Sequence, residues 1–211
     1  MVRKIMLEFA DLTGLSSAGK APRRHLWTDA FAACNFLELY RQTSDEKYKH
    51  LALRLVDQVH NRLGRHREDD SRTGWISGLD EEEDKRHPTK GGLRIGKALN
   101  ERRPADPFDE YLTWERDGQC DHYLTKWMHA LNRLSWVIED STYNTWAMEL
   151  AKTVHTRFAF VPPYGNQKRM YWKKGIDLFR PLVPSRGHHD PLNGFIPYNQ
   201  LQAAAAKDSE R

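Results

Sequence analysis

The feature that most restricts the fold of this chain is an internal repeat. Residues 39–62 and 134–157 match at an offset of 95 residues, with eight identities in 24 ungapped positions, where chance gives roughly one or two. The identical pairs are Leu39/Leu134, Asp45/Asp140, Tyr48/Tyr143, Ala52/Ala147, Leu55/Leu150, Val59/Val154, His60/His155 and Arg62/Arg157. Such a chain is built from copies of one supersecondary unit.

Each copy of the repeat has the pattern of two helices. Residues 28–43 are apolar nearly all round, which is typical of a helix buried on every side. Residues 46–63 place apolar side chains three or four apart, as in an amphipathic outer helix, with Asp45 as N-cap and Gly64 after the C-terminus. Residues 119–138 and the stretch that follows Asp140 repeat this alternation. The pattern predicts two pairs of consecutive helices.

A third unit begins at Asp190, because an N-cap Asp followed by Pro191 is a strong helix start. Alternating buried and amphipathic helices predict an all-α fold of the α/α-toroid type, in which helical hairpins form concentric rings. About two and a half hairpins form an incomplete ring, so we expect a truncated chain, completion by another chain, or self-association through the open ends. The predicted organisation is an N-terminal segment 1–24, one domain 25–206 with hairpins 28–63 and 119–158, loops 64–117 and 159–189 and a third start 190–206, and a polar tail 207–211.

Composition excludes several classes of protein. The net charge is +4 and the basic residues are scattered among acids, so we expect no nucleic-acid partner. No run of about 18 apolar residues occurs, so we expect no membrane span. The N-terminus lacks the pattern of a signal peptide, and Cys34 and Cys120 are far apart in sequence. Both observations favour a cytoplasmic protein with free thiols.

Two short motifs resemble ligand sites but lack the required context. The string Gly91–Lys97 does not have phosphate-loop spacing. His188-His189-Asp190 resembles the His-Asp pair of metal-dependent phosphohydrolases, but Pro191 makes a helix begin there instead of running through the pair. We therefore predict neither a metal nor a cofactor.

The residues that open each buried helix are the best candidates for chemistry. Helix N-termini carry partial positive charge and free N–H groups, and the long loops lie on the same face of a ring. Each opening contains an acid and contains or adjoins a histidine, the groups that general acid–base catalysis uses. Trp27, Trp114 and Tyr123 add flat rings on which a sugar can stack. The remaining members of the openings are Asp29, Asp117, His122, Lys126, His189 and Asp190.

The segments Asp117-Gly118-Gln119 and His122–Trp127, together with Trp27–Phe31, resemble inner-helix openings of the six-hairpin glycosidase-like superfamily. Its relatives include unsaturated-glucuronyl hydrolases and the N-acylglucosamine 2-epimerase group. The likeness is one of architecture and spacing over about residues 25–205, and no single motif is diagnostic. It implies that Asp29, Asp117, His122 and Asp190 are catalytic, and that Trp27, Trp114, Tyr123, Lys126 and His189 bind substrate.

Structural interpretations of the same residues stay open. Asp29 and Asp190 are also candidates for simple N-caps, Asp117 for a turn residue before Gly118, and His122 for a core histidine. Lys126 requires an acidic partner such as Asp29 or Asp121. The acidic run 80–84 has the composition of a solvated loop, and the repeated His60 and His155 suggest a shared packing role.

Taken together, these patterns favour an enzyme acting on a carbohydrate or another polyhydroxy compound, of hydrolase or sugar epimerase type. Two alternatives remain at this stage. One is a non-catalytic helical-repeat scaffold that binds a protein or peptide. The other is an inactive, truncated relative of such an enzyme.

Overall fold

The structure, a computed structural model, describes residues 1–16, 21–183 and 189–209. The helices in these ranges are α1 (Val2–Leu12), α2 (Leu26–Thr43), α3 (Glu46–Leu63), α4 (Glu81–Arg86), α5 (Glu110–Glu115), α6 (Asp121–Ile138), α7 (Thr142–Phe158) and α8 (Asp190–Ser209). The strands, each of two residues, are β1 (Gln119–Cys120), β2 (Ala159–Phe160), β3 (Arg169–Met170) and β4 (Lys173–Lys174). The predicted all-α class is confirmed.

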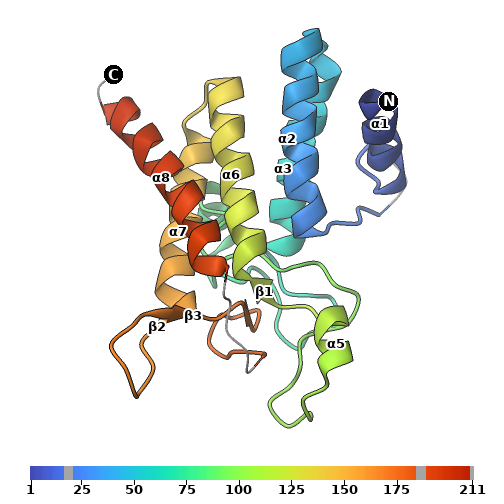
Figure 1. Cartoon of the computed structure of the whole chain (residues 1–211). Helices are drawn as coiled ribbons and strands as arrows, with labels where there is room; N and C mark the ends of the chain where they lie inside the picture. The colour runs from blue at the N-terminus through green and yellow to red at the C-terminus, as the bar shows by residue number, and fades with distance from the viewer. Residues whose placement is uncertain (17–20, 184–188, 210–211) are drawn as a thin grey trace.

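Helix α6 lies in the middle of the molecule and packs against α2, α7 and α8, while α3 packs against α2 (Figure 1). The turns between α2 and α3 and between α6 and α7 are short, so each pair runs antiparallel. Helices α2, α6 and α8 all begin at the lower end of the view in Figure 1, where the loops and strands gather. The openings of the three predicted units therefore share one end of the molecule.

The repeat corresponds to shared packing and shared turns. Ala52, Leu55 and Val59 of α3 are fully buried, and so are their counterparts in α7, Ala147, Leu150 and Val154. Ser44 and Glu139, which follow α2 and α6 at equivalent positions, both adopt left-handed backbone conformations with φ of 53° and 59°. The same tight turn thus ends the first helix of each pair.

Helix boundaries differ from the predicted ones for local reasons. Helix α2 begins at Leu26, and the Asp29 carboxylate accepts the His25 backbone N–H in its first turn. Helix α6 begins two residues after 119 because Gln119 and Cys120 pair with β4. Gly64 directly follows α3, as we expected, with a right-handed φ of −78°.

The predicted 64–117 loop contains the short helices α4 and α5. Residues 80–83 are exposed, as we expected, but the segment is helical instead of a loop and Asp84 is buried. Asp80 caps α4 by accepting the N–H groups of Glu82 and Glu83, and Asp84 is buried with its carboxylate on the Ser77 hydroxyl. Helix α1, in the segment for which we predicted no element, packs against α2 with Met6 and Ala10 buried.

Buried Gln119 organises the loops beneath the helices. Its side-chain oxygen accepts the Leu93 N–H, and its amide donates to the carbonyls of Gly91 and Ile176. A Cβ atom at Gly92, where φ is +77°, would overlap this amide. The glycine-rich segment 91–96 is therefore a loop that is hydrogen-bonded to Gln119, just before the N-terminus of α6.

Candidate acid–base site at the helix N-termini

A histidine and an aspartate from different helices meet at the shared end of α6 and α8. His122 Nδ1, in the first turn of α6, lies 3.3 Å from Asp190 Oδ1, the first residue of α8. The Asp190 side chain is 6% exposed and that of His122 is 26% exposed. The carboxylate is therefore shielded, while the imidazole is partly open to solvent.

Aromatic rings surround this pair. The ring of Trp27, from α2, lies with its centroid 5.6 Å from that of His122 and 5.2 Å from that of Tyr123. The rings of His122 and Tyr123 are 4.7 Å apart in a T-shaped contact, and His25 packs edge-on against Tyr123 at 5.6 Å. The structure thus joins Trp27, His122, Tyr123 and Asp190 from three helix openings into one cluster.

Lys126 lies one turn further along α6, beside α8. Its ammonium donates to the Asn193 side-chain oxygen at 3.2 Å. The acidic partner that we expected, Asp29 or Asp121, is not its hydrogen-bond partner, because a neutral amide takes that place. Lys126 and Asn193 connect α6 to α8 near the His122–Asp190 pair.

Asp121 is a member of this region that sequence reasoning did not select. Its side chain is fully buried, and within the described residues neither carboxylate oxygen has a hydrogen-bond partner. Burial raises the pKa of Asp121 to about 8, and the charge of Asp190 adds to the increase. Asp121 therefore carries a proton at neutral pH. Its place beside His122 in the sequence was the available signal, but its missing partners belong to tertiary structure.

Tyr198 on α8 faces the same interior region. Its hydroxyl is buried and has no hydrogen-bond partner within the described ranges. Burial, and then the charge of Asp121, raise the pKa of Tyr198. The tyrosine remains neutral, and its ring packs edge-on against His155.

Asp29 is held close to the cluster but faces a different set of partners. Its carboxylate accepts the His25 N–H at 2.8 Å and lies 3.5 Å from the Arg24 guanidinium. Burial raises the pKa of Asp29 to about 6, against the opposing effects of Arg24 and of the His25 N–H. This geometry orders the first turn of α2.

Asp117 is the centre of a buried ion-pair network. Its carboxylate lies 2.5 Å from Arg94 and 3.4 Å from Arg67, and it accepts the backbone N–H groups of Gly96 and Gly118. It is fully buried. A carboxylate with this many partners is suited to holding loops together, and no contact joins it to His122.

Two remaining predicted residues lie outside the cluster. Trp114, on α5, is 55% exposed and stacks on Trp172 with ring centroids 5.2 Å apart. His189 is exposed, next to Asp190. His188, in the same predicted opening, lies outside the described residues.

The histidine and acids of the cluster are suited to proton transfer.

In the ranges described, no three histidine, cysteine, aspartate or glutamate side chains are arranged to hold a metal ion. None of the helices there has the length and apolar character that crossing a membrane requires. The two cysteines are unpaired, and burial raises the pKa of Cys120 to about 12, so it is a thiol and not a thiolate.

Comparisons with family models, with curated proteins and with solved structures found no match to this chain.

Proposed function

We propose that this chain forms part of an α/α-toroid enzyme that transfers protons to or from a sugar, with its site at the openings of α2, α6 and α8. The observation that carries the proposal is the His122–Asp190 pair, flanked by the rings of Trp27 and Tyr123. Two antiparallel helix pairs with their first helices opening at one end support the ring architecture.

His122 is the general acid–base group in this proposal. Asp190 beside Nδ1 favours the tautomer that carries its proton on that nitrogen, so Nε2 is left to accept a proton. Trp27 and Tyr123 provide aromatic rings next to the imidazole. Asp190 is therefore a positioning residue, and the aromatic rings orient the sugar.

Asp121 adds a protonated carboxyl behind this pair. Because it is fully buried, it does not touch substrate. Because it is protonated at neutral pH, Asp121 places no second negative charge beside Asp190. Sugar hydrolysis and sugar epimerisation both require the proton transfer that His122 would perform.

The test combines two assays on the full chain. A panel of chromogenic aryl glycosides detects hydrolysis, and deuterium incorporation from D2O into reducing sugars detects proton abstraction at carbon. We expect activity in one assay, lowered at least about 100-fold by His122→Ala and less by Asp190→Asn.

The matched control is His50→Ala, which removes an exposed histidine from α3. It is expected to leave activity unchanged. The proposal fails if neither assay gives a signal, or if His122→Ala, shown to be folded by circular dichroism, is as active as the unchanged chain.

A second candidate is a non-catalytic helical scaffold. The observation in its favour is a stripe on α8, where Leu192, Phe195 and Ile196 are 62%, 64% and 52% exposed. Their spacing places them on one helical face, as in a helix that packs against a partner. Binding of a protein partner by the chain, with no activity on sugars, would favour this candidate.

A further inference from the structure

A groove that lies apart from the His122 cluster is lined mainly by cationic side chains. It has a volume of about 710 Å³ and lies between residues 22–24, the last turn of α3, residues 65–69 and residues 94–98. Six arginines and Lys97 contribute to it, against the acids Glu68 and Asp69. Its size is in the range of small-molecule sites.

Several of these arginines are already occupied by the fold. Arg94 donates to the carbonyls of Arg62 and Arg65 and pairs with Asp117. Arg67 donates to the carbonyls of Lys97 and Ala98. These bonds hold the groove in place, and the bond from Arg94 to the Arg62 carbonyl also satisfies an acceptor in the last turn of α3.

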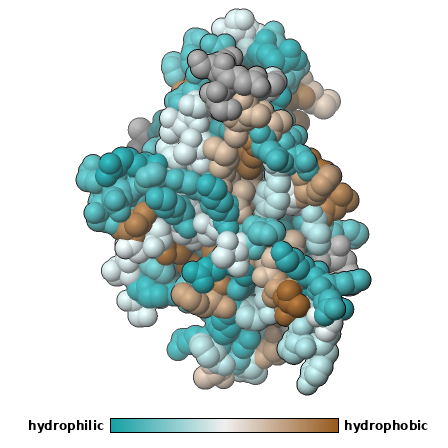
Figure 2. Space-filling model, turned by 90° about the vertical axis from the view of Figure 1, so that its left-hand side faces the viewer, coloured by the Kyte–Doolittle hydropathy of each residue, from teal (hydrophilic) through white to brown (hydrophobic). Residues whose placement is uncertain are grey.

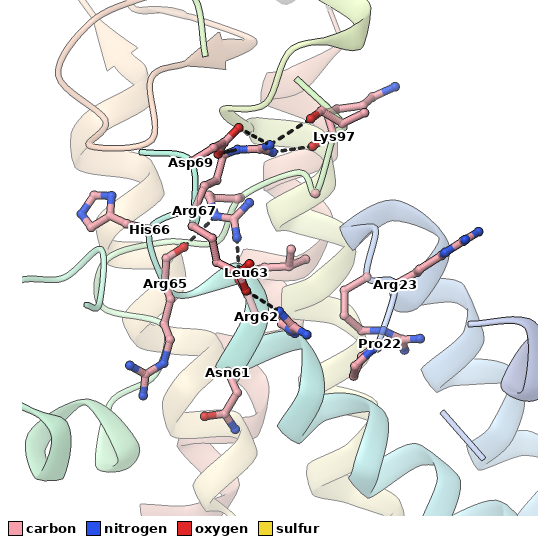
Figure 3. A pocket seen from close by; sticks show the side chains of 15 residues that line it. Pro22, Arg23, Asn61, Arg62, Leu63, Arg65, His66, Arg67, Asp69 and Lys97 are labelled. Carbon is pink, nitrogen blue, oxygen red and sulfur yellow. Dashed lines mark hydrogen bonds and ion pairs between the residues drawn. The ribbon is translucent and has the colours of Figure 1, made fainter. Parts of the chain in front are cut away.

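Three other cationic side chains of the groove are free to contact a ligand. Arg23 and Lys97 have no ion-pair partner within the described residues. Arg62 lies 3.3 Å from Glu68, but the Glu68 side chain is 94% exposed, so the pair is weak. Figure 3 shows Arg62 near the centre of the view, with the ends of Arg23 and Lys97 extending outward to its right.

The acids of the groove do not neutralise it. Glu68 is almost fully exposed, and the Asp69 side chain, which pairs with Arg67, is 56% exposed. Arg67 pairs with Asp69 and Asp117, and Arg94 pairs with Asp117, so the excess positive charge comes mainly from Arg23, Arg62 and Lys97. The groove therefore has a positive potential that favours anions.

We propose that this groove binds a phosphorylated small molecule, with its phosphoryl oxygens contacted by Arg23, Arg62 and Lys97 around the fixed Arg67. An arginine guanidinium donates two parallel hydrogen bonds to phosphate oxygens. Several separate cations bind a ligand with more than one negative charge better than they bind a single carboxylate. The site does not depend on the proton-transfer function proposed above.

Isothermal titration calorimetry of the full chain with inorganic pyrophosphate tests this site at constant ionic strength. We expect saturable binding of one pyrophosphate, weakened at least about tenfold in the double variant Arg62→Gln/Lys97→Gln, because two charged donors are lost. Both side chains have outward-extending ends, so the variant is expected to melt within a few degrees of the unchanged chain.

The matched control is Arg54→Gln/Lys152→Gln, which removes the same two charges from exposed positions on α3 and α7. It is expected to bind pyrophosphate with unchanged affinity. Absence of saturable binding, or an equal loss of affinity in the control, overturns the site. A drop in melting temperature without loss of binding in the Arg62/Lys97 variant would show that these residues only stabilise the fold, and would overturn it too.

Discussion

Asp117 and Asp69 are both acids that contact Arg67, but their surroundings differ. Asp117 is fully buried against Arg94, whereas the side chain of Asp69 is 56% exposed. Removing one member of a buried pair leaves an uncompensated charge, whereas an exposed pair contributes little. We expect Asp117→Ala to lower the free energy of unfolding by about 3–5 kcal/mol, measured by urea denaturation.

Asp69→Ala is the comparison, with an expected change of about 0–1 kcal/mol. Equal effects of the two substitutions would show that Asp117 does not hold the loops together. In that case the prediction that Asp117 is catalytic would again be the better explanation of this residue.

Asp121 makes stability depend on pH near neutrality. Its folded pKa of about 8 lies above the ordinary value of 3.8, so between these values the folded protein binds one proton more than the unfolded chain. The free energy of unfolding therefore falls as pH rises. For one proton the slope is about 1.4 kcal/mol per pH unit, so we expect a loss of about 2 kcal/mol between pH 6.5 and 8.

The window begins at pH 6.5 because His60 acts in the opposite direction below it. Burial lowers the pKa of His60 to about 3, so its contribution to stability grows as pH rises, and only about 0.4 kcal/mol remains to be gained above pH 6.5. The variant Asp121→Asn is expected to give a flat profile from pH 6.5 to 8 in urea titrations. An unchanged slope in the variant would mean that Asp121 is not the protonated group.

At the scale of elements, the two copies of the helix pair use the repeated histidine differently. His60 on α3 is buried, and its Nε2 accepts the indole N–H of Trp127 at 3.1 Å. His155, at the same position of α7, is exposed and touches the ring of Tyr198. The shared packing role that we predicted holds for His60 and only partly for His155.

This difference predicts different costs of substitution. His60→Ala leaves the Trp127 indole N–H buried without an acceptor and opens a space between α3 and α6. We expect it to lower the free energy of unfolding by at least about 1–3 kcal/mol. His155→Ala is expected to change it by less than about 0.5 kcal/mol in the same chemical denaturation assay. Similar losses for both would argue against a special role for the Trp127 bond.

At the scale of the whole molecule, the exposed apolar residues show where further packing is possible. The face seen in Figure 2 has brown apolar patches separated by hydrophilic and intermediate surface. The stripe of Leu192, Phe195 and Ile196 on α8 is regular and exposed, as in a helix that packs against a partner.

We therefore expect the chain to self-associate through α8. Light scattering across a concentration series should show a mass that increases with protein concentration. The variant Phe195→Lys/Ile196→Lys should remain monomeric, because each lysine places a charge in the apolar contact. A wild-type chain that stays monomeric throughout would show that the predicted open edge is wrong.

Much of the helical framework was predictable because its signals are local. The spacing of Leu55 and Val59, the capping acid Asp45 and the Asp190-Pro191 start all act within one or two turns of helix. The burial of Asp84 and the strand β1 were missed because both depend on contacts with other segments. Asp84 is buried through its contact with Ser77, and β1 forms by pairing with β4, a segment distant in the sequence.

The sequence by itself determined the repeated helix pairs and the set of acids, histidines and aromatic residues that open the buried helices. Only the tertiary structure decided which of them meet. It placed His122 beside Asp190, enclosed Asp117 among arginines and gave Lys126 an amide partner. It also buried the Asp121 carboxyl with no hydrogen-bond partner among the residues that the structure describes. The reason is physical: helix formation depends on neighbours in sequence, whereas the charge state and reach of a side chain depend on the segments folded against it.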